Sequence, residues 1–380
     1  MKLMVRKNSI IKNNIEILFL LLSFPLLIIP SIPPFRDIQS VSTWIKGYYY
    51  INYLDLGFIK RGFIGSLFKV FRLSDITNPS LLVIFSHLII ASIVGLLFWK
   101  YAKEAFSEWK RKDKYIFYVL FTLSPVLFIR LGYDTGRMDL WCLMITLITL
   151  FLLQLKDFDY LNSAIILSLS ITIQLLIHEA SLLFYIPLMS CLYIYKFPNN
   201  FAFYLKNVFP VFSIPLICSI MLLIFGRYDA SQEELNLYLQ NISNELAGSM
   251  PMELTWSLKE NIQFAMSFLT LHRFLGGHLI VTSYYLLLLL FTFNFVKLPL
   301  YFKLSTLVPL SLSFLACDST RFVASSSICC FLMILISAKE KLLYTPEKLR
   351  FLIYILSISF FICGPWGISP SDPLPLLKYY

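Results

Sequence analysis

The sequence predicts an all-α protein, a polytopic bundle of about eleven transmembrane helices, and three observations support this fold class. The 380 residues are 58% hydrophobic and only 14% charged, a composition that would leave a soluble domain with far too much exposed apolar surface. Apolar stretches of about 15–20 residues recur, which is the length that crosses a hydrocarbon core of about 30 Å. The stretches are continuous, whereas the strands of a membrane barrel alternate polar and apolar residues.

We expect one integral membrane domain over residues 1–380. The first span, near residues 15–30, follows a basic N-terminal segment but is not followed by a small-residue cleavage site, so we interpret it as an uncleaved helix. The other spans are predicted near residues 81–99, 115–131, 139–155, 162–177, 180–195, 208–225, 278–296, 304–317, 322–338 and 350–364.

Lys and Arg gather in every second gap between these spans. With the N-terminus inside, 19 of the 32 basic residues but only 8 of the 22 acidic residues fall on the cytoplasmic side. This asymmetry is the positive-inside pattern. We therefore predict a cytoplasmic N-terminus and a periplasmic C-terminus, and we do not interpret the net charge of +10 as a sign of a nucleic-acid partner.

Two long gaps lie on the outer side, over residues 31–80 and 226–277. In the first, residues 58–71 alternate apolar and basic side chains, which predicts an amphipathic helix at the membrane surface. Tyrosines gather in the same loop and suit an aromatic belt at the level of the lipid headgroups; they are Tyr48, Tyr49, Tyr50 and Tyr53.

In the second outer loop, residues 230–247 predict a polar helix with Asp229 or Ser231 as its N-cap. After a break at residues 248–251, the more apolar residues 252–275 are expected to return along the membrane. The cytoplasmic gaps are short and contain no Walker or dinucleotide motif. This argues against a subunit of an ATP-driven transporter.

The seven cysteines all fall within or at the ends of apolar spans, and none has the spacing of metal ligands. We interpret them as small apolar residues packed in helices. The sequence thus predicts no disulfide framework, no metal site and no cofactor.

Ionisable residues at membrane depth are costly and usually functional, and in this chain they gather in the outer turns. Asp134, Arg137 and Asp139 share one short turn at the start of a predicted helix. An arginine beside two carboxylates can hold a phosphate or diphosphate while one carboxylate acts as a base. The alternative is an ion pair within the loop that only fixes the hairpin.

His178 and Glu179 interrupt an apolar run that is too long for one helix, which predicts a tight outer turn between two short helices. Glu179 is a candidate general base whose pKa is raised by desolvation. The alternative is a structural His–carboxylate pair that locks two helices together. His87, inside an apolar helix, is expected to be a hydrogen-bonded packing residue.

Two further clusters lie on the outer side. Asp318 and Arg321 are three residues apart, so they can form a local ion pair, or Arg321 can reach inward to the same site as Arg137. Asp55, Lys60 and Arg61 lie in the first outer loop, where the two basic side chains either extend to lipid headgroups or bind a lipid-linked diphosphate.

Guanidinium groups and carboxylates on one face suit displacement at a sugar carbon with diphosphate as the leaving group. Arginine stabilises the charge that develops on the phosphate oxygens, and a carboxylate takes the proton of the acceptor hydroxyl. We expect Arg61, Arg137 and Arg321 to bind the diphosphate. The candidate bases are Asp134, Asp139 and Glu179, with His178 assisting.

The Gly-Arg137-Met-Asp139 turn before a helix, followed by Leu-Leu-Ile-His178-Glu-Ala-Ser-Leu-Leu-Phe-Tyr-Ile-Pro187, resembles polytopic polysaccharide polymerases of the Wzy and EpsG type. In that family an arginine opens one helix and a later helix carries a histidine followed by small and apolar residues. The resemblance is specific over about residues 131–187; the remainder matches in architecture, and the acidic residues in these motifs depart from the family pattern.

The resemblance implies a fold related to C-type glycosyltransferases in the inner membrane of a bacterium. It implies the joining of undecaprenyl-diphosphate-linked repeat units of O-antigen, capsule or exopolysaccharide at the periplasmic face, with a chain-length regulator as a membrane partner. Three alternatives stay open. They are a C-type enzyme that adds one sugar from a polyprenyl-phosphate donor, a flippase or exporter of lipid-linked glycans, and a purely structural membrane subunit.

Overall fold

The computed structural model describes residues 41–107 except 42 and 77, 135–154, 158–248 except 230, 254–268, 289–314 except 291 and 295, and 319–342 except 341. Within these ranges the regular elements are helices and no strand is present. The predicted all-α fold class is therefore confirmed for the described part of the chain.

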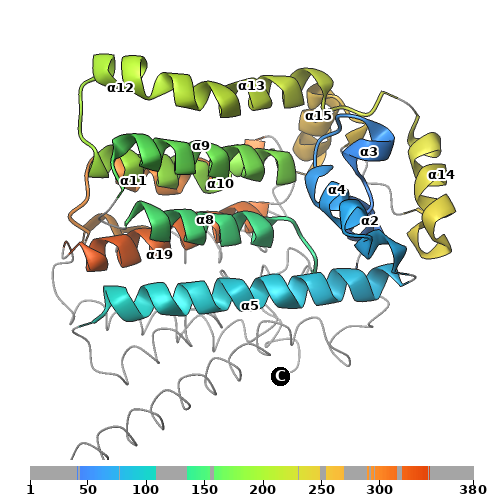
Figure 1. The fold of residues 1–380 in the computed structure, drawn as a ribbon, viewed down its shortest axis with the longest axis horizontal. Helices are drawn as coiled ribbons and strands as arrows, with labels where there is room; N and C mark the ends of the chain where they lie inside the picture. Colours follow the sequence, from blue (N-terminus) through green and yellow to red (C-terminus); the bar gives the residue numbers. More distant parts are fainter. Residues whose placement is uncertain are drawn as a thin grey trace, which may run out of the picture.

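The long helices form stacked rows (Figure 1). Helix α5 (Pro79–Ala105) packs against α8 (Asp139–Leu153), α8 packs against α9 (Tyr160–Ile177), and α9 packs against α13 (Phe209–Phe225). Helix α19 (Ser319–Lys339) contacts α5 and lies largely buried within the bundle. Adjacent rows therefore bury their apolar faces against one another, and α13 is the outermost row in this view.

Shorter elements complete the bundle. They are α10 (Ser181–Phe184), α11 (Ile186–Lys196), α12 (Phe201–Asn207), α18 (Leu300–Leu304) and the 3₁₀ helix η7 (Ser305–Phe314). A second group gathers at one end of the long helices, on the right of Figure 1. It includes α2 (Thr43–Tyr48), α3 (Tyr53–Leu56), α4 (Phe63–Val70), α14 (Gln232–Ile242) and α15 (Leu258–Phe268), and the chain also forms the 3₁₀ turns η3 (Leu73–Asp75) and η4 (Asn244–Leu246).

Three described helices are long and apolar enough to cross a membrane: Pro79–Ala105, Tyr160–Ile177 and Arg321–Lys339. A fourth span is obtained if α12 and α13, which meet at a bend of 73°, are counted together. These helices indicate a membrane protein, as the composition predicts, but they do not establish about eleven spans.

Local chemistry explains where several helices begin. The Asn78 side chain accepts a hydrogen bond from the Leu81 amide ahead of Pro79, and Asp159 caps α9 in the same way. In the polar segment after α13, Ser231, one of the two predicted caps, accepts from the Glu234 amide. The helix that follows ends at Ile242, earlier than predicted.

Two predicted helices differ from those observed, and both differences involve proline. The span predicted near residues 180–195 is divided into α10 and α11 by a break at Tyr185, with Pro187 in the first turn of α11. The segment expected to be α-helical from residue 304 is a 3₁₀ helix over Ser305–Phe314 with Pro309 inside it. Proline has no amide proton to continue the α-helical hydrogen bonds.

Candidate functional site

Five ionisable side chains from four separate segments form one connected set, which we call the ion-pair cluster: Arg61, Asp139, His178, Glu179 and Arg321. Arg61 comes from the loop between α3 and α4, and Asp139 from the start of α8. The adjacent pair His178 and Glu179 occupies the break between α9 and α10, and Arg321 lies in the first turn of α19.

Asp139 and Arg321 make a bidentate ion pair. Arg321 donates from Nε to Oδ2 and from Nη2 to Oδ1, each at 2.5 Å, although the residues are 182 positions apart. The Asp139 side chain has no exposed surface, and its position at the N-terminus of α8 places it at the positive end of the helix dipole. Both carboxylate oxygens are thus held by one guanidinium, which itself lies over the Phe184 ring.

Glu179 and Arg61 make the second ion pair. Arg61 Nε donates to Oε2 at 2.9 Å and Nη2 donates to Oε1 at 2.5 Å. Arg61 also contacts the Tyr48 hydroxyl, and its backbone has a φ of +65°, a conformation that non-glycine residues rarely adopt. Its side chain is 11% exposed and that of Glu179 is 34% exposed, so this pair is the more accessible one.

His178 connects the two pairs. Its Nε2 lies 2.7 Å from Arg321 Nη2, and its Nδ1 lies 3.6 Å from Glu179 Oε2. Because an arginine can only donate, the contact with Arg321 requires Nε2 to be the acceptor. The Ala180 amide donates to Nδ1 at 3.2 Å, so the two contacts compete for the one acceptor nitrogen of a neutral ring.

The cluster changes the pKa values of its two residues at the helix break. Burial raises the pKa of Glu179, but the Arg61 guanidinium and His178 lower it by more, so the pKa lies well below its ordinary value. Desolvation acts in the expected direction, but the expected net rise of the Glu179 pKa is wrong for this paired state. Burial and Arg61 also lower the pKa of His178, although Glu179 acts in the opposite direction.

A buried latch positions the start of α8. The Tyr49 hydroxyl donates to the Gly136 carbonyl at 2.9 Å, and the Gly136 amide donates to His87 Nδ1 at 3.1 Å. Gly136 has a φ of +93°, and a Cβ atom there would lie 2.2 Å from Val83 Cγ1. The turn thus requires glycine, and it lies directly before Arg137, whose guanidinium is 5.2 Å from the centre of the Trp44 ring.

The latch uses His87 as a packing residue, and it buries tyrosines that were predicted to form an aromatic belt at the lipid headgroups. His87 is 2% exposed and hydrogen-bonded, as predicted for a packing residue. Tyr48, Tyr49 and Tyr50 are no more than 3% exposed, so they do not form a lipid-facing belt. Sequence reasoning missed Tyr48 and Tyr49 as contacts of the site because an aromatic cluster does not reveal which face is buried.

The segment that contains α3 and α4 holds a separate polar network around Asp55. The carboxylate contacts Lys69 and accepts from Asn52 Nδ2 at 3.0 Å and from the Tyr238 hydroxyl at 2.7 Å. These partners lower the pKa of Asp55 to about 2, the Lys69 hydrogen bond contributing most. The network joins the loop to α14. Asp55 and Arg61 therefore make different contacts, although they were predicted as one cluster.

The remaining predicted residues divide into two groups. The Lys60 amide donates to the Gly226 carbonyl at 2.8 Å and its side chain is half-buried. Asp134 and Asp318 lie outside the described residues. The structure therefore does not describe a local Asp318–Arg321 pair. Arg321 does extend to Asp139 at the start of α8. Among the described residues no group of three His, Cys, Asp or Glu side chains is placed to hold a metal ion.

Comparisons with protein families, with curated proteins and with solved structures found no match for this chain. The cluster contains two guanidinium groups, two carboxylates and one neutral imidazole, and each of these groups contacts the next. Such a set can bind an anion through arginine and move a proton through Glu179 and His178.

Proposed function

We propose that the protein is a glycosyltransferase of the membrane, a polymerase that joins undecaprenyl-diphosphate-linked oligosaccharide units at the periplasmic face. The observation that supports this proposal most is the continuous contact Arg61–Glu179–His178–Arg321–Asp139. The transfer needs an anion-binding group and a base near each other, and the cluster supplies both.

The two carboxylates differ in a way that assigns their roles. Asp139 is fully buried and both its oxygens accept from Arg321, so it holds that arginine in place. Glu179 is 34% exposed, which makes it the carboxylate that an acceptor hydroxyl can reach. We therefore assign Glu179 as the general base and Asp139 as a positioning residue.

The Arg61–Glu179 pair provides a way to couple donor binding to base activation. Phosphate oxygens of the donor compete with Glu179 for the Arg61 guanidinium, because both are bidentate acceptors. When Arg61 turns to the diphosphate, Glu179 loses the main group that lowers its pKa, and burial then raises that pKa. Glu179 becomes a stronger base only once the donor is bound.

The proposed reaction transfers the glycan from the diphosphate to an acceptor hydroxyl. The acceptor hydroxyl oxygen forms a bond to the anomeric carbon, and the bond from that carbon to the diphosphate oxygen breaks. The hydroxyl proton passes to Glu179, and the negative charge of the leaving diphosphate is stabilised by Arg61, with Arg137 and Arg321 nearby in the fold. His178, whose Nδ1 lies 3.6 Å from Glu179 Oε2, helps to position Glu179 during the exchange.

The finer topology belongs to the same proposal. About eleven spans in the inner membrane of a bacterium, a cytoplasmic N-terminus and a periplasmic C-terminus would place the cluster on the outer side, where lipid-linked glycans are joined. A membrane protein that regulates chain length is the expected partner.

Deleting the gene and separating the surface polysaccharide on a gel tests the reaction class. Loss of a polymerase leaves single repeat units on their lipid anchor, because each unit is still made and exported. Loss of a single-sugar transferase or a flippase leaves no repeat unit on the surface. Loss of a structural subunit leaves the ladder of polymer lengths on the gel unchanged. The proposal requires the first result, in a strain that regains its ladder when the gene is restored.

A further inference from the structure

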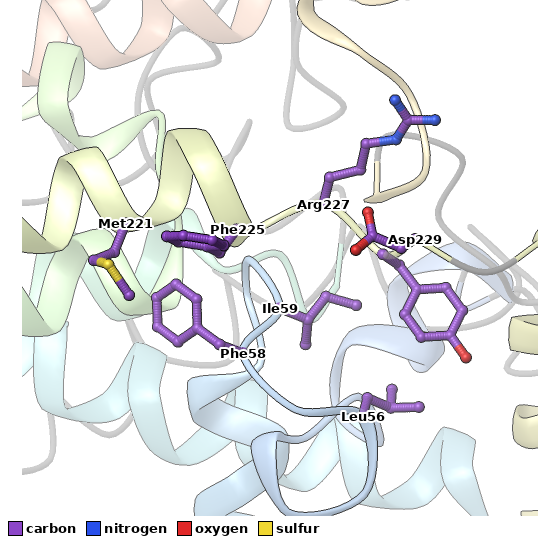
Figure 2. Close-up of a pocket in the computed structure, with 8 residues that line it drawn as sticks. Leu56, Phe58, Ile59, Met221, Phe225, Arg227 and Asp229 are labelled. Atoms are coloured by element: carbon purple, nitrogen blue, oxygen red, sulfur yellow. The ribbon is translucent and has the colours of Figure 1, made fainter.

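A pocket of about 550 Å³ lies outside the ion-pair cluster, between the loop after α3 and the end of α13 (Figure 2). Its lining comprises Leu56, Phe58, Ile59, Met221, Phe225, Arg227, Tyr228 and Asp229. This volume is within the range of small-ligand sites in proteins. The Lys60 amide donates to the Gly226 carbonyl at 2.8 Å and so ties the two walls together.

The pocket is amphipathic from one side to the other. In Figure 2, Met221 and the rings of Phe58 and Phe225 lie on one side, whereas Arg227 and Asp229 lie on the other. A ligand that fits this lining has an apolar end and a charged end. Because one rim residue is basic and the other acidic, a headgroup that carries both charges complements this rim.

The surface around the pocket indicates that the ligand comes from the lipid bilayer. Helix α13 exposes a surface of large apolar side chains along its length, including Ile217 at 58%, Leu223 at 78% and Ile224 at 63%. The sequence becomes polar at Gly226, directly after the helix. An apolar helix surface that ends in charged residues is typical of the boundary between lipid chains and headgroups.

We propose that this pocket binds one bilayer phospholipid with a zwitterionic aminophosphate headgroup. One acyl chain occupies the apolar side, against Met221 and the two phenylalanine rings. The phosphate binds Arg227 and the primary ammonium group binds Asp229, so both charges of the headgroup are complemented. The bound lipid fastens the end of α13 to the loop that carries Arg61, whatever reaction the cluster performs.

The test uses the full chain purified in mild detergent, mixed with equal amounts of phosphatidylethanolamine and phosphatidylglycerol, and native mass spectrometry to count retained lipids. The wild type should retain one phosphatidylethanolamine in preference to phosphatidylglycerol. Met221→Trp fills the pocket and should lower retention by about tenfold, a change of about 1.4 kcal/mol. Leu223→Trp, on the exposed face of the same helix, is the matched control and should retain lipid like the wild type.

Asp229→Asn tests the headgroup separately, because this exposed substitution leaves the apolar lining intact. It should reduce the preference for phosphatidylethanolamine by about threefold, the scale of an exposed charge contact. Equal retention of both lipids by the wild type would overturn the proposal, as would unchanged preference in Asp229→Asn. Equal loss in Met221→Trp and Leu223→Trp would mean that only non-specific lipid around the helices was being counted.

Discussion

Glu179 and Arg61 are 118 residues apart in the chain and are joined by three hydrogen bonds, at 3.1 Å, 2.9 Å and 2.5 Å. Their pairing joins the loop between α3 and α4 to the break between α9 and α10. The same break places His178 against Arg321, so one interrupted helix connects two ion pairs. The account of function rests on this connection.

Replacing Glu179 with Gln should abolish the polysaccharide ladder while protein abundance is kept. The amide keeps the shape of the carboxylate but cannot take a proton, and loss of a general base typically costs about 10²–10⁴ in rate. Asp55→Asn is the matched control, because Asp55 is a carboxylate of the same loop system with different contacts. Equal loss in both variants would show that charge in the loops matters only for folding.

Breaking the buried pair should affect stability first. Asp139→Asn leaves the Arg321 guanidinium without its charge partner, and removal of one partner of a buried ion pair costs about 3–5 kcal/mol. The double variant Asp139→Leu with Arg321→Met should recover much of that loss, since no unpaired charge remains. Thermal unfolding in detergent measures both. A double variant that is no more stable than Asp139→Asn would contradict the pairing.

The cluster should lose stability as the pH falls. The pKa of His178 is lowered in the folded protein, so the neutral ring contributes stability that is fully present above the unfolded value of about 6.5. That contribution declines below this pH as the unfolded state takes up the proton first. Glu179, also with a lowered pKa, adds a second decline below about 4.3.

Melting curves across this pH range check the prediction. His178→Gln should reduce the decline that begins near the ordinary pKa of histidine, about 6.5, to the part that the buried His87 contributes, and it should leave the more acidic decline in place. A wild-type curve that is flat down to the more acidic range would contradict a buried neutral histidine.

Gly136→Ala should lower the amount of folded protein more than Gly57→Ala does. Both glycines have positive φ, at +93° and +69°, and alanine at such positions costs about 1–3 kcal/mol. A Cβ at Gly136 would also lie 2.2 Å from Val83, whereas nothing lies within 4 Å of a Cβ at Gly57. Abundance and melting temperature of the two variants measure the difference, and equal values would contradict the buried latch.

The sequence predicted the long helices well because continuous apolar runs determine them. The predictions near residues 81–99, 162–177, 208–225 and 322–338 correspond to α5, α9, α13 and α19. Charge asymmetry could assign the sides of the membrane, but it contains no information about helix contacts. The structure describes three or four candidate spans, so the predicted total stays a prediction.

The partners in the site could not be predicted, because they are set by packing between distant segments. Spacing suggested Asp318 for Arg321, whereas the observed partner, Asp139, begins a helix 182 residues earlier. Lys60 and Arg61 are adjacent, yet it is Arg61, with its left-handed backbone, that pairs with Glu179. Single-sequence patterns identify such residue types but not their pairing.

The most direct test of the central claim uses the purified protein in vesicles with lipid-linked repeat units and follows the products on a gel. The wild type should convert single units into a ladder, Glu179→Gln and Arg61→Gln should leave them unjoined, and Asp55→Asn should still form the ladder. Vesicles in which the wild type forms no ladder, or in which Glu179→Gln forms one at the normal rate, would contradict the account.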